Sequence, residues 1–389
     1  MTTLTGDQKM MLEAVRKFML KEIAPHSLEM DETQVFKLEL KQKFRELGLY
    51  SAIVPIKYGG MGLDLTSFCL VIEEISKVDA AIGVIIQDHG TGLRPILLCD
   101  DEDLKKDIFS RVAKDGISIG FAITEPQAGS DTASITTRAV RNGENYTLSG
   151  RKTFITNAGI SDYYVVFALT DQQARHRGMS AFLVHGDSPG LEIGKQENKL
   201  GLRASPTADL ILEDVVVPEK YRIGEENKGF LLLMKTLDAS RPTIAAQGLG
   251  IAEAALEYAI RYAGERAQFG KPIIDFQGLE FLIADMATQI EAARALLYKA
   301  TRLYDEGFEN VTPYSAMTKL FCTDVAMRVT TDAVQILGGY GCMKDHPVER
   351  MMRDAKVTQI YEGTNQIQLI VIGRSIKRKG YPLHSGAEI

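Results

Sequence analysis

The stretch Phe121-Ala122-Ile123-Thr124-Glu125-Pro126-Gln127-Ala128-Gly129-Ser130-Asp131 separates two kinds of sequence. Before it, from about residue 6 to 118, apolar residues recur at the helical period. After it, to about residue 228, runs rich in β-branched and aromatic residues alternate with turn signals such as Asn142-Gly143. From about residue 229 the helical period returns. This order predicts an α+β fold with domains at residues 1–120, 121–228 and 229–389, the middle one a small antiparallel β domain.

The composition excludes several classes of protein. The 389 residues carry a net charge of -6, which argues against nucleic acid as the main partner. No stretch approaches the ~20 apolar residues of a membrane span, and Met1–Asp7 lacks the apolar region of a signal peptide. The four cysteines are scattered and no His-Glu-x-x-His occurs, so we expect no metal site and a cytoplasmic location.

Two segments of the β region are candidates for ligand binding. In residues 121–131, small residues and hydroxyls would let the backbone approach a flat ring or a pyrophosphate. In Arg151-Lys152-Thr153-Phe154-Ile155-Thr156-Asn157, Phe154 and Thr156 are two residues apart and would share a strand face. The alternatives are an ordinary strand-to-turn junction and a core Phe beside a surface Thr.

The glycine-rich segments favour helix structure over nucleotide binding. Gly248-Leu249-Gly250 lies inside a helical period and does not follow a strand, which favours helix packing. Gly338-Gly339-Tyr340-Gly341 follows a helical pattern and, taken alone, indicates a helix C-cap.

A carboxylate stands beside a glycine in Tyr361-Glu362-Gly363-Thr364-Asn365-Gln366-Ile367-Gln368, just before an apolar run. Gly363 permits a sharp turn that would direct Glu362 into a cavity. Burial there would raise the pKa of the carboxyl group and make it a candidate general base. The alternative is a solvated acidic residue near a helix N-terminus.

These segments together resemble the acyl-CoA dehydrogenases, over roughly residues 6 to 379. The resemblance rests on residues 124–131, on 335–341 and 361–364, and on three further segments: Lys199–Thr207, Arg266–Lys271 and Phe276-Gln277. It implies the fold of that family, with an N-terminal helical domain, a middle antiparallel β-barrel or sandwich domain and a C-terminal four-helix bundle.

The resemblance also implies FAD as cofactor. The predicted contacts with the flavin and its phosphates are Phe121, Ile123, Thr124, Gly129, Ser130, Phe154 and Thr156. Positions matching contacts to the pyrophosphate and adenosine across a subunit boundary are Arg266, Phe269, Gln277, Gln335 and Gly339, and Thr364 and Gln366 match a further contact. A cofactor shared between subunits implies an oligomer, usually a homotetramer that is a dimer of dimers.

Glu362 falls where most of the family keeps the catalytic base. A minority carries the base in another segment, which here reads Leu237-Asp238-Ala239-Ser240-Arg241 with Ser240 at the alternative site. The resemblance assigns Asp238 and Arg241 to the acyl-CoA, together with Ser130, Tyr361 and Gly363.

The reaction implied is oxidation of an acyl-CoA thioester to the 2,3-enoyl-CoA. Glu362 would remove the α-proton, the β-hydrogen would leave as hydride to flavin N5, and electron-transfer flavoprotein would be the acceptor. Alternatives within the fold are an enoyl-CoA reductase running the reverse reaction, a glutaryl- or dicarboxylyl-CoA dehydrogenase, an acyl-CoA oxidase and a DNA-binding stress-response protein. The acidic balance and the presence of Glu362 argue against the last.

Two features depart from the commonest members. Phe154 stands where a Trp is frequent, which keeps a stacking surface but loses the indole N–H. The helix expected to floor the acyl pocket carries Gln87, Asp88, His89 and Thr91, which are polar for a fatty tail. Either these side chains face away, or the acyl group is short, compact or alicyclic, as in cyclohexanecarboxyl-CoA.

Two charged residues of this helix suggest finer hypotheses. Arg94 hints at a dicarboxylic substrate, but the nearby Asp88 would oppose a second carboxylate. A sharper hypothesis makes Asp88 a second acid–base group that reaches a distal ring carbon.

Overall fold

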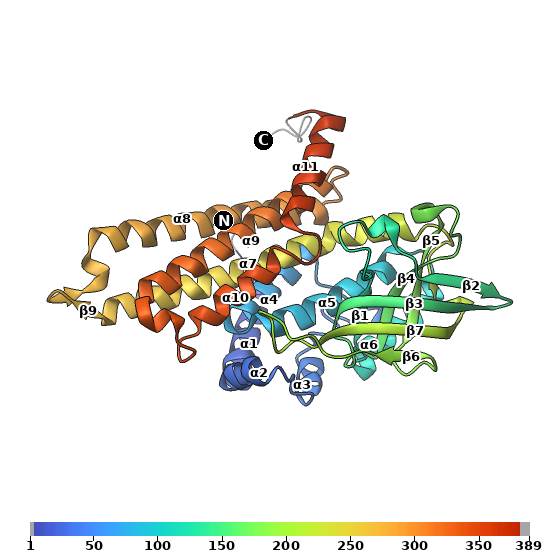
Figure 1. Ribbon diagram of the computed structural model, residues 1–389, viewed down its shortest axis with the longest axis horizontal. Helices are drawn as coiled ribbons and strands as arrows, with labels where there is room; N and C mark the ends of the chain where they lie inside the picture. Colours follow the sequence, from blue (N-terminus) through green and yellow to red (C-terminus); the bar gives the residue numbers. More distant parts are fainter. Residues whose placement is uncertain (1–3, 382–389) are drawn as a thin grey trace.

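The computed structural model describes residues 4–381 as an elongated body with a β domain at one end and long helices reaching to the other (Figure 1). The N-terminal helices are α1 (Gly6–Phe18), α2 (Ser27–Thr33), α3 (Leu40–Glu46), α4 (Leu65–Val78), α5 (Ala80–Leu98) and α6 (Glu102–Asp115). Asp64, Asp79 and Asp101 accept backbone N–H groups at the starts of α4, α5 and α6, which fixes where these helices begin.

The middle segment forms a mixed sheet. Its strands are β1 (Ile119–Ala122), β2 (Arg138–Asn142), β3 (Asn145–Thr156), β4 (Tyr163–Leu169), β5 (Met179–His185), β6 (Leu191–Ile193), β7 (Thr207–Pro218) and β8 (Arg222–Ile223). They lie in the order β6-β7-β3-β2-β4-β5-β8, with β1 beside β4. Most pairs are antiparallel, as expected, but β1 and β2 each run parallel to β4. The parallel β1–β4 pair is possible because the β2–β3 hairpin separates the two strands along the chain.

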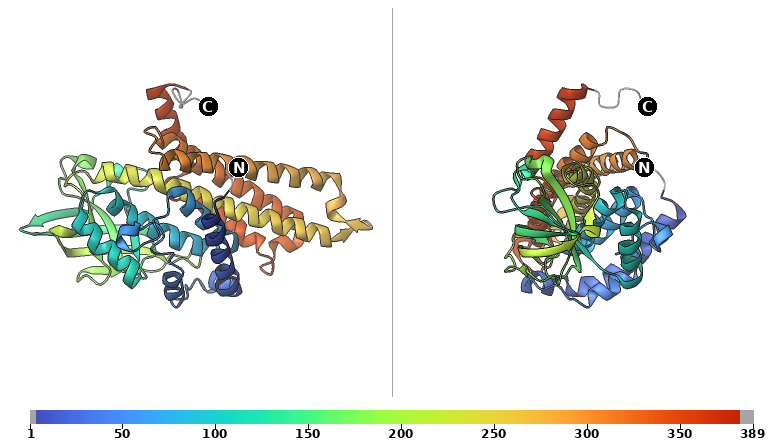
Figure 2. Two further views of the ribbon diagram at one scale, coloured as in Figure 1. Left: turned by 180° about the vertical axis from the view of Figure 1, so that it is seen from behind. Right: turned by 90° about the vertical axis from the view of Figure 1, so that its right-hand side faces the viewer.

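The C-terminal region is helical again. It contains α7 (Gly229–Glu265), the hairpin of β9 (Ala267–Gln268) and β10 (Lys271–Pro272), α8 (Gln277–Asp305), α9 (Thr312–Leu337), α10 (Val348–Thr358) and α11 (Asn365–Lys379). Helices α7, α8 and α10 all pack against α9. Helix α11 touches α9 at its base and then projects from the body, as both views in Figure 2 show.

The apolar core joins all three regions. One cluster of buried side chains includes Ile72 of α4, Val165 of β4, Ala246 of α7 and Ile290 of α8. A second cluster lies on the other face of the sheet and includes Tyr164. Successive residues of β4 enter different clusters because side chains alternate across a strand. The sheet is therefore packed on both faces, and its inner face is fixed against the helices.

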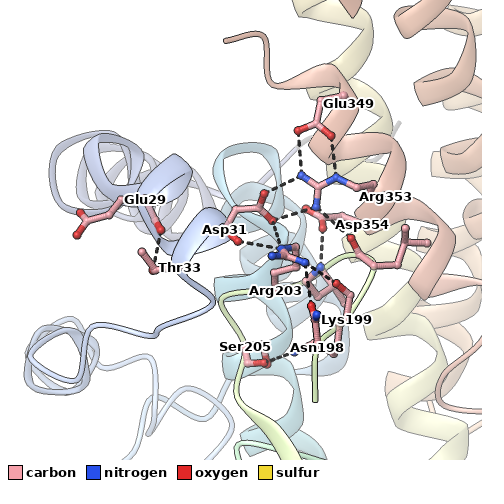
Figure 3. Close-up of polar contacts among 12 residues, drawn as sticks. Glu29, Asp31, Thr33, Asn198, Lys199, Arg203, Ser205, Glu349, Arg353 and Asp354 are labelled. Carbon is pink, nitrogen blue, oxygen red and sulfur yellow. Dashed lines mark hydrogen bonds and ion pairs between the residues drawn. The ribbon is translucent and has the colours of Figure 1, made fainter. Parts of the chain in front are cut away.

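A group of charged side chains ties the N-terminal region to α10 (Figure 3). The guanidinium of Arg353 donates to both carboxylate oxygens of Asp31 of α2, at 3.1 and 2.7 Å. Arg203, in the loop before β7, donates to the backbone oxygen of Asp31 at 2.9 Å. Asp354 accepts the backbone N–H of Leu202 at 2.6 Å. These contacts hold α10, which leads directly into the turn that carries Glu362.

Three sequence expectations concern absences. None of the helices between residues 4 and 381 combines the length and apolar character needed to span a bilayer. Over the same residues, no three His, Cys, Asp or Glu side chains gather as metal ligands. All four cysteines are free. Residues 1–3, part of the stretch from which we predict no signal peptide, lie outside the described residues, as do residues 382–389 of the third predicted domain.

Candidate active site

Glu362 lies on a tight turn between α10 and α11. Its φ is 54°, unusual for a residue with a side chain, and the φ of Gly363 is 89°. The hydroxyl of Thr364 accepts the N–H of Ile367 and begins α11. The amide of Gln368 donates to the backbone oxygen of Gly363 at 2.8 Å. The turn therefore directs Glu362 toward α5 and α7 instead of along a helix.

The carboxylate of Glu362 is bound from both of those helices. Ser240 of α7 donates to Oε2 at 2.8 Å, and the amide of Gln87 of α5 approaches Oε1 at 3.4 Å. Burial raises the pKa of Glu362, while these hydrogen bonds and the charges of Arg241 and Lys319 oppose the rise. A carboxyl group whose pKa is raised by burial is suited to take a proton from carbon near neutral pH.

A second carboxylate, Asp88 of α5, lies in the same region. Asn157, at the end of β3, donates to Oδ2 at 3.0 Å and to the backbone oxygen of Ile85 at 3.0 Å. Burial raises the pKa of Asp88 well above its usual range, and the negative charge of Glu362 raises it further. Two carboxyl groups that interact in this way favour a state in which one of them holds a proton.

The other polar residues of α5 divide between two directions. The amide of Gln87 donates to Thr91 at 2.8 Å as well as approaching Glu362, so these two side chains lie on the side of the candidate base. His89 turns away: its Nδ1 accepts the N–H of Ile119 at 2.9 Å, and its Nε2 contacts the backbone oxygen of Tyr50 at 2.8 Å. His89 therefore ties α5 to β1.

Helix α7 supplies the residues predicted to contact the acyl-CoA. Asp238 accepts Arg241 at 3.0 Å and the hydroxyl of Thr312 at 2.7 Å, so it also fixes the start of α9. Arg241 is buried, and its Nε has no hydrogen-bond partner among the described residues. The hydroxyl of Tyr361 donates to Gln247 of α7, which holds the residue before Glu362.

The flavin contacts predicted in the β domain differ in how exposed they are. Phe121 and Ile123 are buried, Thr124 and Thr156 are half-buried, and Gly129 and Ser130 are exposed. The ring of Phe154 is 64% exposed although it belongs to a strand. Its φ is 57°, and the pairing of β3 with β7 shifts between Lys152 and Ile155. This bulge turns an aromatic ring outward.

Of the remaining predicted cofactor residues, Thr364 and Gln366 follow Glu362 at the start of α11, and the others belong to a different part of the C-terminal region. A cleft of about 510 Å³ is lined by Tyr262, Arg266, Gln268, Ile273, Ile336, Leu337, Gly338, Gly339, Tyr340 and Met343. It brings together Arg266 and Gly339, whereas Gln277 and Gln335 are exposed and outside its lining. Phe269, at the tip of the β9–β10 hairpin, is 95% exposed. This hairpin lies at the opposite end of the molecule from the β domain (Figure 1).

Sequence reasoning missed several residues that shape the site. Lys152 is fully buried and donates to Glu125 at 2.8 Å and to the backbone oxygen of Ile123 at 3.1 Å, which anchors the loop carrying Thr124. Lys319 of α9 is fully buried beneath the Glu362 turn. The signal for Lys319 was a single basic residue in an uncharged run from Thr312 to Thr323.

Three parts of the chain match the same protein family. Residues 5–115 match the acyl-CoA dehydrogenase N-terminal domain, 120–215 the middle domain and 227–377 the C-terminal domain. The chain belongs to the acyl-CoA dehydrogenase family. Its members are flavoprotein oxidoreductases, so the predicted fold and enzyme class are confirmed.

Individual relatives share nearly the whole chain. The cyclohex-1-ene-1-carbonyl-CoA dehydrogenase of Syntrophus aciditrophicus is 45% identical over 97% of this chain and 91% of its own. The cyclohexane-1-carbonyl-CoA dehydrogenase of Geobacter metallireducens is 44% identical over 95% of this chain and 97% of its own. The solved butyryl-CoA dehydrogenase of Megasphaera elsdenii is 43% identical, with a TM-score of 0.95 over 97% of this chain and all of the other.

The flavin predicted from the sequence agrees with a solved relative. A glutaryl-CoA dehydrogenase from Mycobacterium smegmatis, 28% identical with a TM-score of 0.89, was solved with FADH2; the alignment covers 97% of this chain and 96% of that one. The residues present here fit such a group. Gly129 and Gly339 are exposed, and a Cβ added to either would meet no described atom within 4 Å outside its chain neighbours, so the space beside each is open. The exposed ring of Phe154 suits a flat flavin, and Arg266 suits a phosphate.

Proposed function

We propose that this protein is an FAD-dependent acyl-CoA dehydrogenase in which Glu362 removes the α-proton of the thioester. The observation that carries the proposal is the placement of Glu362, a buried carboxylate with a raised pKa on a turn aimed at α5 and α7. The carboxyl group of Asp88 interacts with that of Glu362, and Asn157 holds Asp88 at 3.0 Å.

Different residues of this chain would hold the flavin, orient the base and stabilise the developing charge. Phe154, Thr156 and Thr124 would hold the flavin end of FAD, which when bound supplies the acceptor for the β-hydrogen. Ser240 keeps the Glu362 carboxylate oriented. As the α-C–H bond breaks, its proton passes to Glu362 and the thioester oxygen gains negative charge. Backbone N–H groups at the Glu362 turn are suited to stabilise that charge.

The acyl pocket favours a short, compact or alicyclic acyl group. Gln87 and Thr91 are hydrogen-bonded to each other and stand beside Glu362, so the space next to the base is bounded by polar side chains. Both side chains are buried, so a long alkyl chain would meet a polar wall here in place of the apolar lining that it favours. The two cyclic-acyl relatives share 44–45% of their residues with this chain, which supports a ring-shaped substrate.

Asp88 gives the alicyclic proposal a sharper form. Its interaction with Glu362 places a second acid–base group near the acyl site. We expect Asp88 to act on a distal ring carbon, and a glutaryl or other dicarboxylyl group would be disfavoured because it adds a further carboxylate beside the two carboxyl groups already there. Asp88→Asn should slow ring substrates more than butyryl-CoA. Equal rates for the variant and the wild type on every ring substrate would remove this role.

The test is anaerobic bleaching of the flavin band with a panel of acyl-CoA thioesters. We expect butyryl-, cyclohexanecarboxyl- or cyclohex-1-ene-1-carbonyl-CoA to bleach the purified holoenzyme faster than octanoyl- or palmitoyl-CoA. Faster turnover of the long chains would contradict the compact pocket. A colourless protein that takes up no added FAD would contradict the whole proposal. The reverse direction is tested by mixing the enzyme with an enoyl-CoA and a reduced electron donor and measuring whether the acyl-CoA forms.

The proposal includes partners and location. The β domain and the β9–β10 hairpin, which both carry predicted FAD residues, lie at opposite ends of one protomer, and this supports a cofactor shared between copies and a homotetramer. We further propose electron-transfer flavoprotein as the acceptor, and a cytoplasmic location consistent with four free cysteines.

A further inference from the structure

Lys319 is a buried cation that the reaction above does not use. It lies on α9, and none of its surface is exposed. Its ammonium group donates to Oδ1 of Asn365 at 2.9 Å. Placing an ammonium group in the interior is costly unless it is paired, so a structural or chemical reason for it is required.

Asn365 joins Lys319 to the turn that carries Glu362. Its backbone N–H donates to the oxygen of Gln359 at 3.0 Å and so closes the turn between α10 and α11. Its side-chain amide donates to Thr323 at 3.0 Å and to Asp324 at 2.7 Å. Gln359 also donates to Asp324, at 2.6 Å. Both ends of the turn are therefore held by one face of α9.

Charged groups around the turn couple Lys319 electrostatically to Glu362. The groups that act on Glu362 are Asp88 of α5, Arg241 of α7 and Lys319 of α9, with Tyr361 beside it on the turn. Lys319 is influenced by Glu362, by Asp324 and by Arg241. Burial lowers the pKa of Lys319 to about 7, and the negative charge of Glu362 opposes that change. The ammonium group and the carboxylate thus favour each other's ionised form.

We infer that Lys319 is a positioning residue for the candidate base: through Asn365 it fixes the strained Glu362 turn, and its charge keeps the Glu362 carboxylate ionised. The inference rests on the proposed role of Glu362. It gives Lys319 two contributions that can be tested separately. The hydrogen bond to Asn365 fixes the turn, and the positive charge of the ammonium group favours the ionised form of Glu362.

The test compares Lys319→Met, Lys319→Arg and Asn365→Ala as holoenzymes. The readout is the rate of anaerobic flavin bleaching by the best acyl-CoA, measured from about pH 5.5 to 9.5. For Lys319→Met we expect the acid limb of the profile to move up by about one pH unit, because the carboxylate loses a nearby cation. The rate should also stay below that of the wild type at high pH, because the contact with Asn365 is lost. Lys319→Arg should restore the midpoint. Asn365→Ala should lower the rate severalfold at all pH values without moving the midpoint.

Thr330→Val is the matched control, because Thr330 is also buried on α9 and bonds only within that helix. It should leave the profile unchanged. A Lys319→Met profile with an unchanged midpoint would overturn the charge contribution, whatever its absolute rate. An Asn365→Ala rate equal to that of the wild type would overturn the anchor.

A second measurement does not depend on turnover. An unfolded lysine titrates near 10.5, whereas Lys319 in the fold titrates at about 7. Between these values the unfolded state holds one proton more, so the free energy of unfolding should rise with pH. Lys319→Met should lose that part of the rise, and an identical slope in both proteins would contradict the buried cation. Full activity in Glu362→Gln would contradict the role of Glu362 as the base. It would leave unchanged the result on how Lys319 affects the pH dependence of stability.

Discussion

At the scale of single residues, Glu362 as the proposed base must meet two opposing requirements. It must be buried enough for its pKa to be raised, yet it must ionise to accept a proton. Ser240 resolves the conflict by donating a hydrogen bond to the carboxylate at 2.8 Å. Ser240, at the position that the resemblance gives as the alternative base site, thus supplies a hydroxyl to the proposed base.

Ser240→Ala should therefore raise the pKa of Glu362. The hydrogen bond from Ser240 lowers this pKa, so its loss lets burial raise the pKa further. The protonated fraction of Glu362 then grows at low pH, and the acid limb of the bleaching rate should move upward while the rate at high pH changes little. A pH profile of the reductive half-reaction measures this, and a downward move of the acid limb would be inconsistent with it.

Residues differ in how well the sequence predicted them. Glu362 could be singled out because a carboxylate next to glycine matched a family motif. The side-chain directions of Gln87, Asp88 and His89 could not be predicted, because three consecutive polar residues on a helix face three directions that only the packing of β1 and β3 decides. Lys319 was missed because a lysine is ordinarily solvated.

At the scale of elements, the turn between α10 and α11 is the strained part of the site. The helical period predicted α8, and a run of β-branched and aromatic residues predicted β4. It could not predict the bulge that turns Phe154 outward, since that depends on how β3 pairs with β7, a strand more than fifty residues away in the chain.

Gly363→Ala should destabilise this turn. The φ of Gly363 is 89°, and an added Cβ would lie 2.8 Å from the amide nitrogen of Gln368. A side chain in this conformation costs about 1–2 kcal/mol, so denaturant unfolding should show a loss of that order. Gly373→Ala is the control within α11, because its Cβ would meet nothing within 4 Å. It should be neutral or stabilising, and equal losses for both variants would contradict strain at the turn.

At the scale of the whole molecule, buried charge joins the N-terminal helices to α10. Arg353→Met would leave Asp31 without its bidentate partner, and the side chain of Asp31 is only 6% exposed. Breaking a buried pair costs about 3–5 kcal/mol, which denaturant unfolding would detect. Arg328→Met removes an exposed pair with Asp285 and should cost less than about 1 kcal/mol. Similar costs for the two variants would show that the group in Figure 3 contributes little.

The far end of the molecule should matter for the cofactor. Phe269 is 95% exposed on the β9–β10 hairpin, at the opposite end of the molecule from the β domain, so we expect it to pack on another copy beside FAD. Phe269→Asp should weaken assembly and lower the flavin content. Light scattering with the ratio of flavin to protein absorbance measures both. A variant that keeps its assembly and its full flavin content would contradict a shared cofactor site.

The most direct test of the account is the α-proton step in Glu362→Gln. The variant keeps the size of the side chain and one acceptor oxygen but cannot accept a proton from carbon. Loaded with FAD and mixed anaerobically with the best acyl-CoA, it should bleach at least 10²–10⁴-fold more slowly than the wild type, the usual contribution of a general base. Glu280→Gln, an exposed change on α8, should react like the wild type. Bleaching of Glu362→Gln within tenfold of the wild-type rate would show that another group removes the proton.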